Sequence, residues 1–168
     1  NVTDTVKEYH YTLYYYDQGG NLVKTVPPKG IYPIYRSTWI DSVENAKRNG
    51  TQLTPMHSFV TRYCYNSLNQ VNLQKSPDGG VSKFWYDRLG RLALSQNAKQ
   101  SGWGNVYSYT LYDVLGRIIE VGQISASSAM TDASAKNDAS LQSWFTANTA
   151  KRGEITQTGY DLAFGTSP

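Results

Sequence analysis

Cysteine, histidine and long apolar runs are scarce in this chain of 168 residues, and each scarcity excludes a class of protein. A single cysteine, Cys64, excludes an intrachain disulfide framework and a metal site built from several cysteines. No run of about 18 apolar residues occurs, so we expect no membrane insertion. The two histidines, His10 and His57, lack metal-ligand spacing with each other or with Cys64. We therefore expect no metal and no other cofactor.

Charge is also low, because charged residues make up 17% of the chain, against about 25% in an average globular domain. The net charge of +3 is spread along the sequence without a run of Lys or Arg. Surfaces that bind nucleic acid gather basic residues on one face, so we expect no nucleic-acid partner. Aromatic residues, in contrast, reach 13%, and 14 of them are tyrosines. This composition favours a β-rich, extracellular protein and argues against disorder.

A short motif recurs in which a tyrosine is followed by Asp or Asn and then, three residues later, by Gly or Asn. The copies are "YYYDQGGNLV", "YCYNSLNQVN", "FWYDRLGRLA" and "TLYDVLGRII", with a fainter fifth, "TGYDLAF", from Thr158. The unit is roughly 21 to 26 residues long, and two copies carry insertions of about one further unit. The key positions of the four clear copies are Tyr16, Asp17 and Gly20; Tyr65, Asn66 and Asn69; Tyr86, Asp87 and Gly90; and Tyr112, Asp113 and Gly116.

Each copy has the signature of a β-hairpin. Aromatic and β-branched runs such as "VSKFWY" and "RLALS" flank the motif, which is typical of strands. Asp after the tyrosine forms an Asx-turn, and Gly three residues later supplies the left-handed conformation that closes the loop. In the second copy Asn66 and Asn69 keep both backbone roles, whereas a catalytic carboxylate would be lost. We therefore interpret these positions as turn formers.

Alternation along the strands predicts a ladder of the motif tyrosines on one face of the sheet. We expect their hydroxyls at a wet edge, with one face of the sheet packed and the other solvated. A tyrosine stripe can also stack sugar rings, although a structural ladder is the favoured interpretation. In the same scheme Arg91 is the first, solvent-facing residue of a returning strand, and Cys64 is a small buried residue within a strand.

Two intervals depart from the hairpin pattern. The insertion near residues 36–55 predicts a short polar helix with Asp41 or Ser42 as its N-cap and Gly50 as its terminator. The insertion near residues 124–153 becomes helix-like through an apolar stripe and ends near Gly153. That stripe consists of Leu141, Trp144 and Phe145.

The second insertion has several interpretations. Its helix can dock aromatic residues on the sheet, which is the favoured one, or form a ligand-binding excursion from a rigid scaffold. The stretch "SASSAMTDASAKNDAS" is also typical of a mobile loop. The glycine-containing stretches "SPDGGV" and "QSGWGN" are interpreted as hairpin connections, because neither leads into a helix as a phosphate-binding loop would.

The copies "YYYDQGGNLV", "FWYDRLGRL" and "YTLYDVLGRI" resemble the YD repeats of the Rhs (rearrangement hotspot) family. The resemblance implies very long secreted or surface proteins in which tandem hairpins wind into one spiralling sheet. In bacterial polymorphic toxins and insecticidal toxin complexes of this family, the sheet forms a hollow shell around a C-terminal toxin. Teneurins use a related barrel in cell adhesion. The Asp-Pro-x-Gly stretch of the family's autoproteolytic shells does not occur here, so no cleavage role is assigned.

We therefore expect residues 1–168 to be one segment of a larger YD-repeat array. Its fold class is mainly β, with tandem antiparallel hairpins in a curved, spiralling sheet that is part of a shell or barrel and carries two short helical insertions. The hairpin units fall near residues 9–28, 59–75, 81–96, 106–123 and 155–164.

The expected function is that of a structural scaffold in a secreted or cell-surface protein, without enzyme activity. The partners implied by the resemblance are adjacent repeats of the same larger chain and an encapsulated toxin domain, a secretion-system component or surface glycans. The alternative is a surface adhesion or carbohydrate-binding module, in which exposed aromatic residues contact the ligand. Its candidate contacts are Trp39, Trp85 and Trp103, and burial of these side chains beneath the sheet would count against it.

Overall fold

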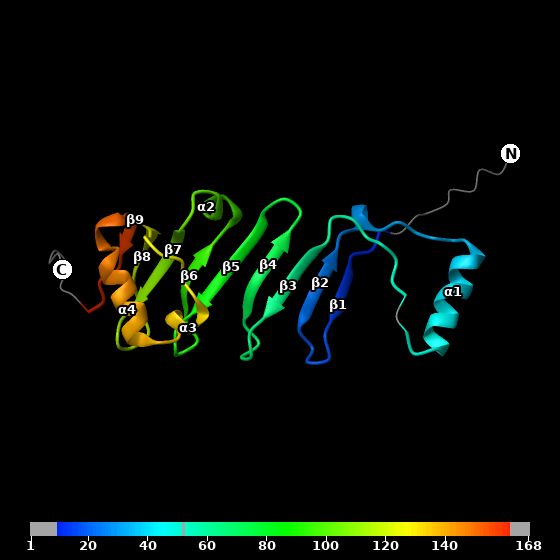
Figure 1. The fold of residues 1–168 in the computed structure, drawn as a ribbon, viewed down its shortest axis with the longest axis horizontal. Coiled ribbons are helices and arrows are strands. Elements are labelled where there is room, and N and C mark those ends of the chain that lie inside the picture. Colours follow the sequence, from blue (N-terminus) through cyan, green and yellow to red (C-terminus); the bar gives the residue numbers. More distant parts are fainter. Residues whose placement is uncertain (1–9, 52, 162–168) are drawn as a thin grey trace. The chain divides into compact units, whose positions relative to one another are not determined.

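The computed structural model describes residues 10–51 and 53–161, and its main feature is a single sheet of nine antiparallel strands (Figure 1). The order of strands in the sheet is their order in the chain, and the sheet is open, with β1 and β9 at its two edges. The predicted mainly β fold of consecutive antiparallel hairpins is thus confirmed. The strands are β1 Leu13–Tyr16, β2 Leu22–Val26, β3 Thr61–Tyr65, β4 Val71–Ser76, β5 Gly80–Tyr86, β6 Leu92–Gln96, β7 Val106–Tyr112, β8 Ile118–Ser125 and β9 Arg152–Gln157.

The chain divides into two compact units, which we call unit 1 (Asn1–Tyr63) and unit 2 (Cys64–Pro168). The described part of unit 1 contains the hairpin β1–β2, the 3-10 helix η1 (Pro28–Gly30), the helix α1 (Ser37–Arg48) and most of β3. Gly30 is needed where it lies, because a Cβ there would stand 2.1 Å from the carbonyl oxygen of Ser58. The backbone of the segment before β3 therefore packs closely on η1.

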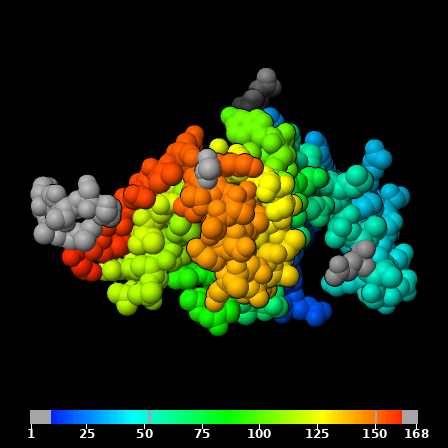
Figure 2. All heavy atoms as spheres, turned by 60° about the vertical axis from the view of Figure 1, so that its left-hand side comes forward, coloured from blue at the N-terminus to red at the C-terminus, as the bar shows by residue number. Residues whose placement is uncertain are grey.

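Unit 2 contains the remaining strands, one short helix between β6 and β7, and the helices of the second insertion. The helices are α2 (Ala98–Gly102), α3 (Asp132–Ala135), α4 (Asp138–Ala147) and the 3-10 helix η2 (Thr149–Lys151). In the space-filling view, α4 and the segment before it form a layer over the strands of this unit (Figure 2).

The helix boundaries correct the sequence prediction in three places. First, α1 begins at Ser37, before Asp41 and Ser42, and its N-cap residue Arg36 makes no side-chain capping bond; Gly50 does follow its end in the left-handed conformation. Second, "QSGWGN" lies partly in α2, because Asn97 and Gln100 form a capping box that starts a short helix. Third, α4 ends at Ala147, since residues from Arg152 onward pair with β8.

The hydrophobic core of unit 2 lies between one face of the sheet and the α3–α4 segment. Cross-strand partners place Trp85, Leu94 and Tyr109 on the same face of β5, β6 and β7. Tyr107 lies on that face as well, opposite Ile124 of β8. The side chains of Phe145 from α4 and of Met130 and Ala135 from the segment before it are buried against them.

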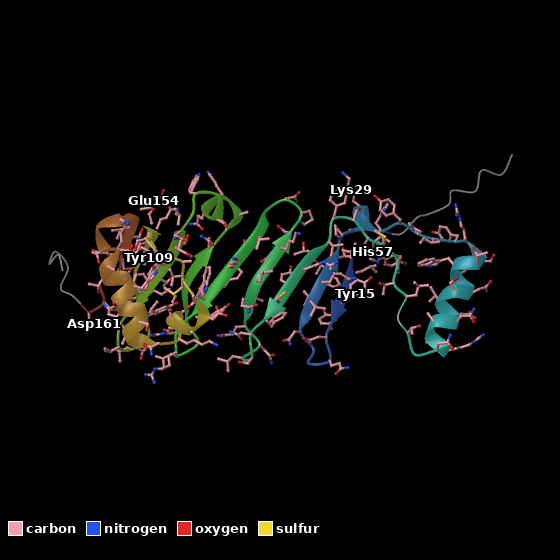
Figure 3. The ribbon with its side chains drawn as sticks, in the orientation of Figure 1. Tyr15, Lys29, His57, Tyr109, Glu154 and Asp161 are labelled. Carbon is pink, nitrogen blue, oxygen red and sulfur yellow. The ribbon has the colours of Figure 1, made fainter. Side chains whose placement is uncertain are left out.

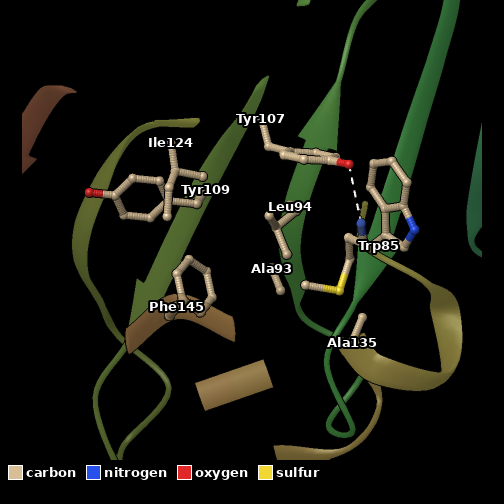
Figure 4. Close-up of a cluster of buried hydrophobic side chains, with 9 residues drawn as sticks. Trp85, Ala93, Leu94, Tyr107, Tyr109, Ile124, Ala135 and Phe145 are labelled. Carbon is tan, nitrogen blue, oxygen red and sulfur yellow. Dashed lines mark hydrogen bonds between the residues drawn. The ribbon is translucent and has the colours of Figure 1, made fainter. Parts of the chain in front are cut away.

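Edge-to-face aromatic contacts dominate this core (Figure 4). The ring of Tyr107 lies 5.4 Å from that of Trp85 and 5.6 Å from that of Trp144, between centroids. The Tyr107 hydroxyl accepts a hydrogen bond from the amide of Met130 at 3.2 Å, so its polar end is satisfied inside the core. The helix of the second insertion therefore docks its aromatic residues on the sheet, as the spacing of Leu141, Trp144 and Phe145 predicts.

Candidate functional site at the repeat turns

Four turns share one hydrogen-bonding pattern, in which the first residue of the turn is Asp or Asn. Its amide donates to the carbonyl of the residue four positions later, at 2.9 Å in each turn. Its side-chain Oδ1 accepts from the amide of that same later residue at 2.8 to 3.0 Å. The residue three positions after the Asp or Asn is left-handed in every turn, with φ of 81° at Gly20, 56° at Asn69, 77° at Gly90 and 82° at Gly116. The motif positions thus act on the backbone in the way that turn formers do.

The residue four positions after the Asp or Asn completes each turn with its side chain. Arg91 Nε donates to Asp87 Oδ2 at 2.7 Å, and Arg117 makes the same bond to Asp113 at 2.7 Å. Amide side chains replace arginine in the first two turns and also bond to the first residue: Asn21 Nδ2 donates to Asp17 Oδ2 at 3.0 Å, and Gln70 Oε1 accepts from Asn66 Nδ2 at 2.9 Å. This position was missed from the sequence, although its signal is visible: four residues after the Asp or Asn, every copy carries a side chain with N–H donors, namely Asn21, Gln70, Arg91 or Arg117.

Arg91 corrects the prediction of a solvent-facing residue. Its guanidinium folds back onto Asp87, which is only 7% exposed, and lies 4.5 Å from the centroid of the Tyr112 ring in the next hairpin. A cation held over an aromatic face contributes about 0.5–1 kcal/mol at exposed sites and more when water is excluded. One side chain thus closes its own turn and contacts the following hairpin.

The motif tyrosines connect neighbouring hairpins through their hydroxyls. Tyr86 donates to the carbonyl of Val71 at 2.8 Å, and Tyr112 donates to the carbonyl of Leu92 at 2.9 Å. Val71 and Leu92 occupy the same position in successive hairpins, five residues after Asn66 and Asp87, respectively. The predicted wet edge is therefore wrong for these two hydroxyls, because they satisfy backbone carbonyls between strands. Burial raises the pKa of Tyr86 and Tyr112 above its ordinary value, so both stay neutral donors.

We call these connections between consecutive hairpins the turn interlock. It comprises the bonds of Tyr86 and Tyr112, the Arg91–Tyr112 contact, and a bond from Gln70 Nε2 to the carbonyl of Gly90 at 2.7 Å. All of these contacts lie within unit 2. The tyrosine bond repeats from one hairpin to the next. The residue four positions after the Asp or Asn also contacts the next hairpin in both cases, Gln70 through the carbonyl of Gly90 and Arg91 through the ring of Tyr112.

The fifth copy of the motif, at Tyr160 and Asp161, makes different contacts from the other four. The guanidinium of Arg117 lies 4.4 Å from the Tyr160 ring centroid, and its Nη1 bonds to the Asp161 carboxylate at 2.7 Å. These bonds to Asp161 and Asp113 raise the pKa of Arg117, while the bond from Arg117 lowers that of the Asp113 carboxyl. Asp161 itself is left-handed, with φ of 58°, so it does not form the turn that Asp17, Asp87 and Asp113 form. The remainder of the hairpin expected near 155–164 lies outside the described residues.

A polar cluster around Glu120 links β9, the last described strand, to β7 and β8. Glu120 accepts hydrogen bonds from Tyr109 at 2.7 Å, from Arg152 at 3.0 Å and from Gln157 at 2.9 Å. Burial, together with the bond to Glu120, raises the pKa of Tyr109 to about 12. Burial opposes the charge of Glu120, but its three donors hold the pKa of this carboxyl below its ordinary value. A neutral phenol and a fully engaged carboxylate suit a structural tie between β7, β8 and β9.

A second polar contact lies in unit 1, between β1 and the segment before β3 (Figure 3). The Tyr15 hydroxyl and His57 Nε2 are 2.9 Å apart, and Lys24 Nζ lies 3.7 Å from the centroid of the Tyr15 ring. His57 Nδ1 is buried and makes no hydrogen bond with the described residues. Burial lowers the pKa of His57, and the charge of Lys24 lowers it further. His57 is therefore neutral in this contact, and His10 is exposed elsewhere.

The three tryptophans proposed as ligand contacts have different surroundings. Trp85 is 7% exposed within the core, and this burial counts against its assignment as a ligand contact. Trp103 is exposed, but Lys99 Nζ lies 5.0 Å from its ring centroid. Trp39 is half-buried on α1 in unit 1 and lines an open depression of about 530 Å³ with Tyr35 and neighbouring residues. Within unit 2, Trp85 and Trp103 therefore do not form a common exposed aromatic platform.

Cys64 also differs from its prediction, because it is exposed, although it does lie in a strand, β3. Alternation explains the exposure: Tyr63 and Tyr65 point to the opposite face and are half-buried. Among residues 10–51 and 53–161, no three or more His, Cys, Asp or Glu side chains are grouped as a metal site would need. None of the helices in this part of the chain is long and apolar enough to cross a bilayer.

Comparison with known proteins shows a similarity to a much longer protein. The chain is similar to Salivary gland surface protein 1 of Aedes aegypti, with 26% identity over 123 residues. The aligned stretch is 72% of this chain but only 3% of the relative, so the relative is a far longer protein. No protein-family model matches the chain.

Proposed function

We propose that this chain is a structural segment of a longer YD-repeat protein that is secreted or displayed at the cell surface. The observation that carries the proposal is the turn interlock. Residues of one motif have the same two roles in successive hairpins: they close their own turn, and they make contacts with the neighbouring hairpin. An array in which each unit contacts only its neighbours is the organisation of a solenoid-like scaffold.

The similarity to a surface protein of much greater length supports both parts of the proposal. A segment aligned with a small fraction of a long chain fits a tandem array, and the relative's name gives the location that we propose for this chain. The resemblance of the motif to Rhs repeats extends the proposal to a spiralling shell wall that encloses a C-terminal toxin. In this proposal the chain performs no catalytic step, and its nearest partners are further repeats.

Burial of the aromatic residues argues against the alternative of a sugar-binding module in unit 2. Trp85, Tyr107 and Tyr109 are buried in the core. The hydroxyls of Tyr86 and Tyr112 are bonded within the turn interlock. The ring of Trp103 has a lysine beside it. A glycan array probed with the purified chain separates the functions. We expect no signal that depends on Trp39 or Trp103; a signal lost in Trp39→Ala or Trp103→Ala would favour the alternative.

The test of the scaffold proposal uses the full-length native protein. Negative-stain electron microscopy is expected to show a continuous wall or shell, and antibody raised against residues 10–161 is expected to label intact cells or the secreted fraction. A string of separate globules, or labelling only after permeabilisation, would overturn the proposal.

A further inference from the structure

The turn that follows α1 contains the triplet Asn49-Gly50-Thr51, which matches the acceptor pattern for N-linked glycosylation. In this pattern a Ser or Thr stands two residues after an asparagine, with any residue except proline between them. Among residues 10–51 and 53–161 no other asparagine has this spacing; a second triplet, at Asn1, lies outside the described residues. The structure therefore allows one acceptor triplet to be judged by its surroundings.

The local fold explains the glycine of the triplet but not the asparagine side chain. The amide of Gly50 donates to the carbonyl of Lys47 at 3.2 Å, and the amide of Thr51 donates to the carbonyl of Ala46 at 2.9 Å. These are the two bonds of a Schellman motif, and Gly50 takes its left-handed position with φ of 66°. Both bonds join backbone atoms, so the helix cap makes no use of the Asn49 carboxamide.

The Asn49 side chain is accessible and unengaged. All three residues of the triplet are exposed, and the Asn49 carboxamide makes no hydrogen bond with the described residues. A Cβ placed on Gly50 would meet no atom within 4 Å, so the outer side of the turn opens to solvent. Asn97 and Asn137, in contrast, use their side chains to cap helices. Asn49 is thus an asparagine whose side chain has no role in the fold around it.

We infer that Asn49 is the acceptor of an N-linked oligosaccharide. The inference rests on the proposed function and deepens it, because this modification belongs to secreted and surface proteins. The similarity to a surface protein of Aedes aegypti supports this choice of modification. Since the cap of α1 uses backbone atoms only, the glycan leaves the helix intact. It also requires this end of α1 to stay in solvent in the full-length protein.

The reaction forms a bond between Asn49 Nδ2 and the anomeric carbon of the first sugar. The donor is a lipid-linked oligosaccharide diphosphate, and a membrane-bound oligosaccharyltransferase is the catalyst. The bond from the anomeric carbon to the diphosphate oxygen breaks, and the lipid diphosphate leaves with the electron pair. Nδ2 loses one proton to a base, so the transfer needs no oxidant or reductant. In the folded chain the Thr51 hydroxyl donates to the carbonyl of Ala46 at 3.1 Å, so we expect transfer before this cap closes.

The test uses the full-length protein from its native source. The denatured protein is treated with a peptide N-glycosidase that accepts core-fucosylated glycans, in water enriched in the heavy isotope of oxygen. This enzyme hydrolyses the glycosylated amide and leaves aspartate, which takes up the heavy oxygen. Trypsin in ordinary water then releases Asn49–Arg62, in which Asn49 is the one asparagine. Mass spectrometry is expected to show heavy-labelled aspartate at this position as the major form of the peptide.

Three variants of the full-length protein, expressed in the same cells, separate the triplet from its position. Thr51→Ala is expected to abolish the label, whereas Thr51→Ser keeps the hydroxyl and retains the label. Asn45→Gln is the matched control, because Asn45 is an exposed asparagine one turn earlier on α1 without Ser or Thr two residues later. This control is expected to leave the label at Asn49 unchanged.

Three results would overturn the inference. The first is an unmodified Asn49 in the isolated protein, and the second is a label that survives Thr51→Ala. The third is aspartate without heavy oxygen, which spontaneous deamidation produces readily where glycine follows asparagine. Antibody labelling of intact cells tests the proposed location separately. Surface labelling with an unmodified Asn49 would leave the proposed function standing, whereas labelling only after permeabilisation would overturn the proposed function itself.

Discussion

Units 1 and 2 contain the same hairpin motif but support it differently. In the described part of unit 1, Val26 is the one buried apolar residue, and Tyr11, Tyr14, Tyr16, Tyr32 and Tyr35 are exposed. In unit 2 the α3–α4 segment covers one face of the sheet, and the core gathers Trp85, Leu94, Tyr107, Tyr109, Ile124 and Phe145. The difference shows that the motif specifies the turn, whereas burial of its aromatic residues comes from what lies beside it.

The motif tyrosines show this most directly. Tyr16 and Tyr112 occupy the same motif position and have the same register shift, yet Tyr16 is exposed while Tyr112 is half-buried, with its hydroxyl bonded to the carbonyl of Leu92. A single hairpin cannot bury its own face, so its stability depends on the neighbouring hairpins. Each variant below compares a residue that has such support with one that does not.

The largest effect is expected from Trp85→Ala. This indole is buried against Tyr107 and the α3–α4 segment, so its removal leaves a cavity and costs about 3–5 kcal/mol of the free energy of unfolding. Trp103→Ala removes the same side chain from the surface of the same unit, and we expect a change within about 0.5 kcal/mol. Urea unfolding followed by circular dichroism measures both, and equal losses would refute the description of the core.

A smaller effect is expected from removing a single tyrosine hydroxyl. Tyr86→Phe and Tyr112→Phe each leave a backbone carbonyl between strands without its donor, at a cost of about 1 kcal/mol. Tyr16→Phe removes a solvent-exposed hydroxyl and is expected to change stability by less than about 0.5 kcal/mol. The same unfolding experiment measures the three variants. A loss in Tyr16→Phe as large as in Tyr112→Phe would remove the distinction between the two units.

The smallest effect is a pH dependence confined to unit 1. Because burial and Lys24 lower the pKa of His57 in the folded state, the unfolded chain binds the proton more readily. The contact with Tyr15 therefore contributes its full stability above the ordinary histidine pKa of about 6.5 and loses it as the pH falls below that value. Exchange of the Ser58 amide, which donates to the carbonyl of Gly30 at 3.0 Å, is expected to accelerate between pH 7.5 and 5.5, after correction for intrinsic exchange. The variant His57→Gln should lack this acceleration, and an identical profile in both proteins would contradict the assignment.

Much of the sheet could be predicted from the sequence, because the information is local. A tyrosine, an Asp or Asn, and a Gly or Asn three residues later define the turn through backbone chemistry, and alternating strands flank it. The stripe of Leu141, Trp144 and Phe145 likewise indicated a helix that docks on the sheet. These signals lie within a few residues of one another.

The remainder depends on contacts between distant residues. The burial of Trp85 follows from its cross-strand position under α3–α4, and no local pattern separates it from the exposed Trp103. Arg91 lies at the Tyr112 ring because the next hairpin is in register beside it, so its solvent-facing prediction was wrong. The helix α2 was missed because it is only five residues long and its signal, the capping box of Asn97 with Gln100, begins directly after the last residue of β6.

The central claim is that one hairpin stabilises the next through the turn interlock, and a double-mutant cycle between Arg91 and Tyr112 tests it most directly. Arg91→Gln keeps a hydrogen-bonding side chain for Asp87 but removes the cation, and Tyr112→Leu removes the ring that this cation covers. We predict a coupling energy of about 0.5–1 kcal/mol between the two substitutions. The control cycle pairs Tyr112→Leu with Arg88→Gln, because Arg88 belongs to the same turn but bonds to Asp138, and its coupling should be below about 0.3 kcal/mol. Additive effects of Arg91→Gln and Tyr112→Leu would contradict the account.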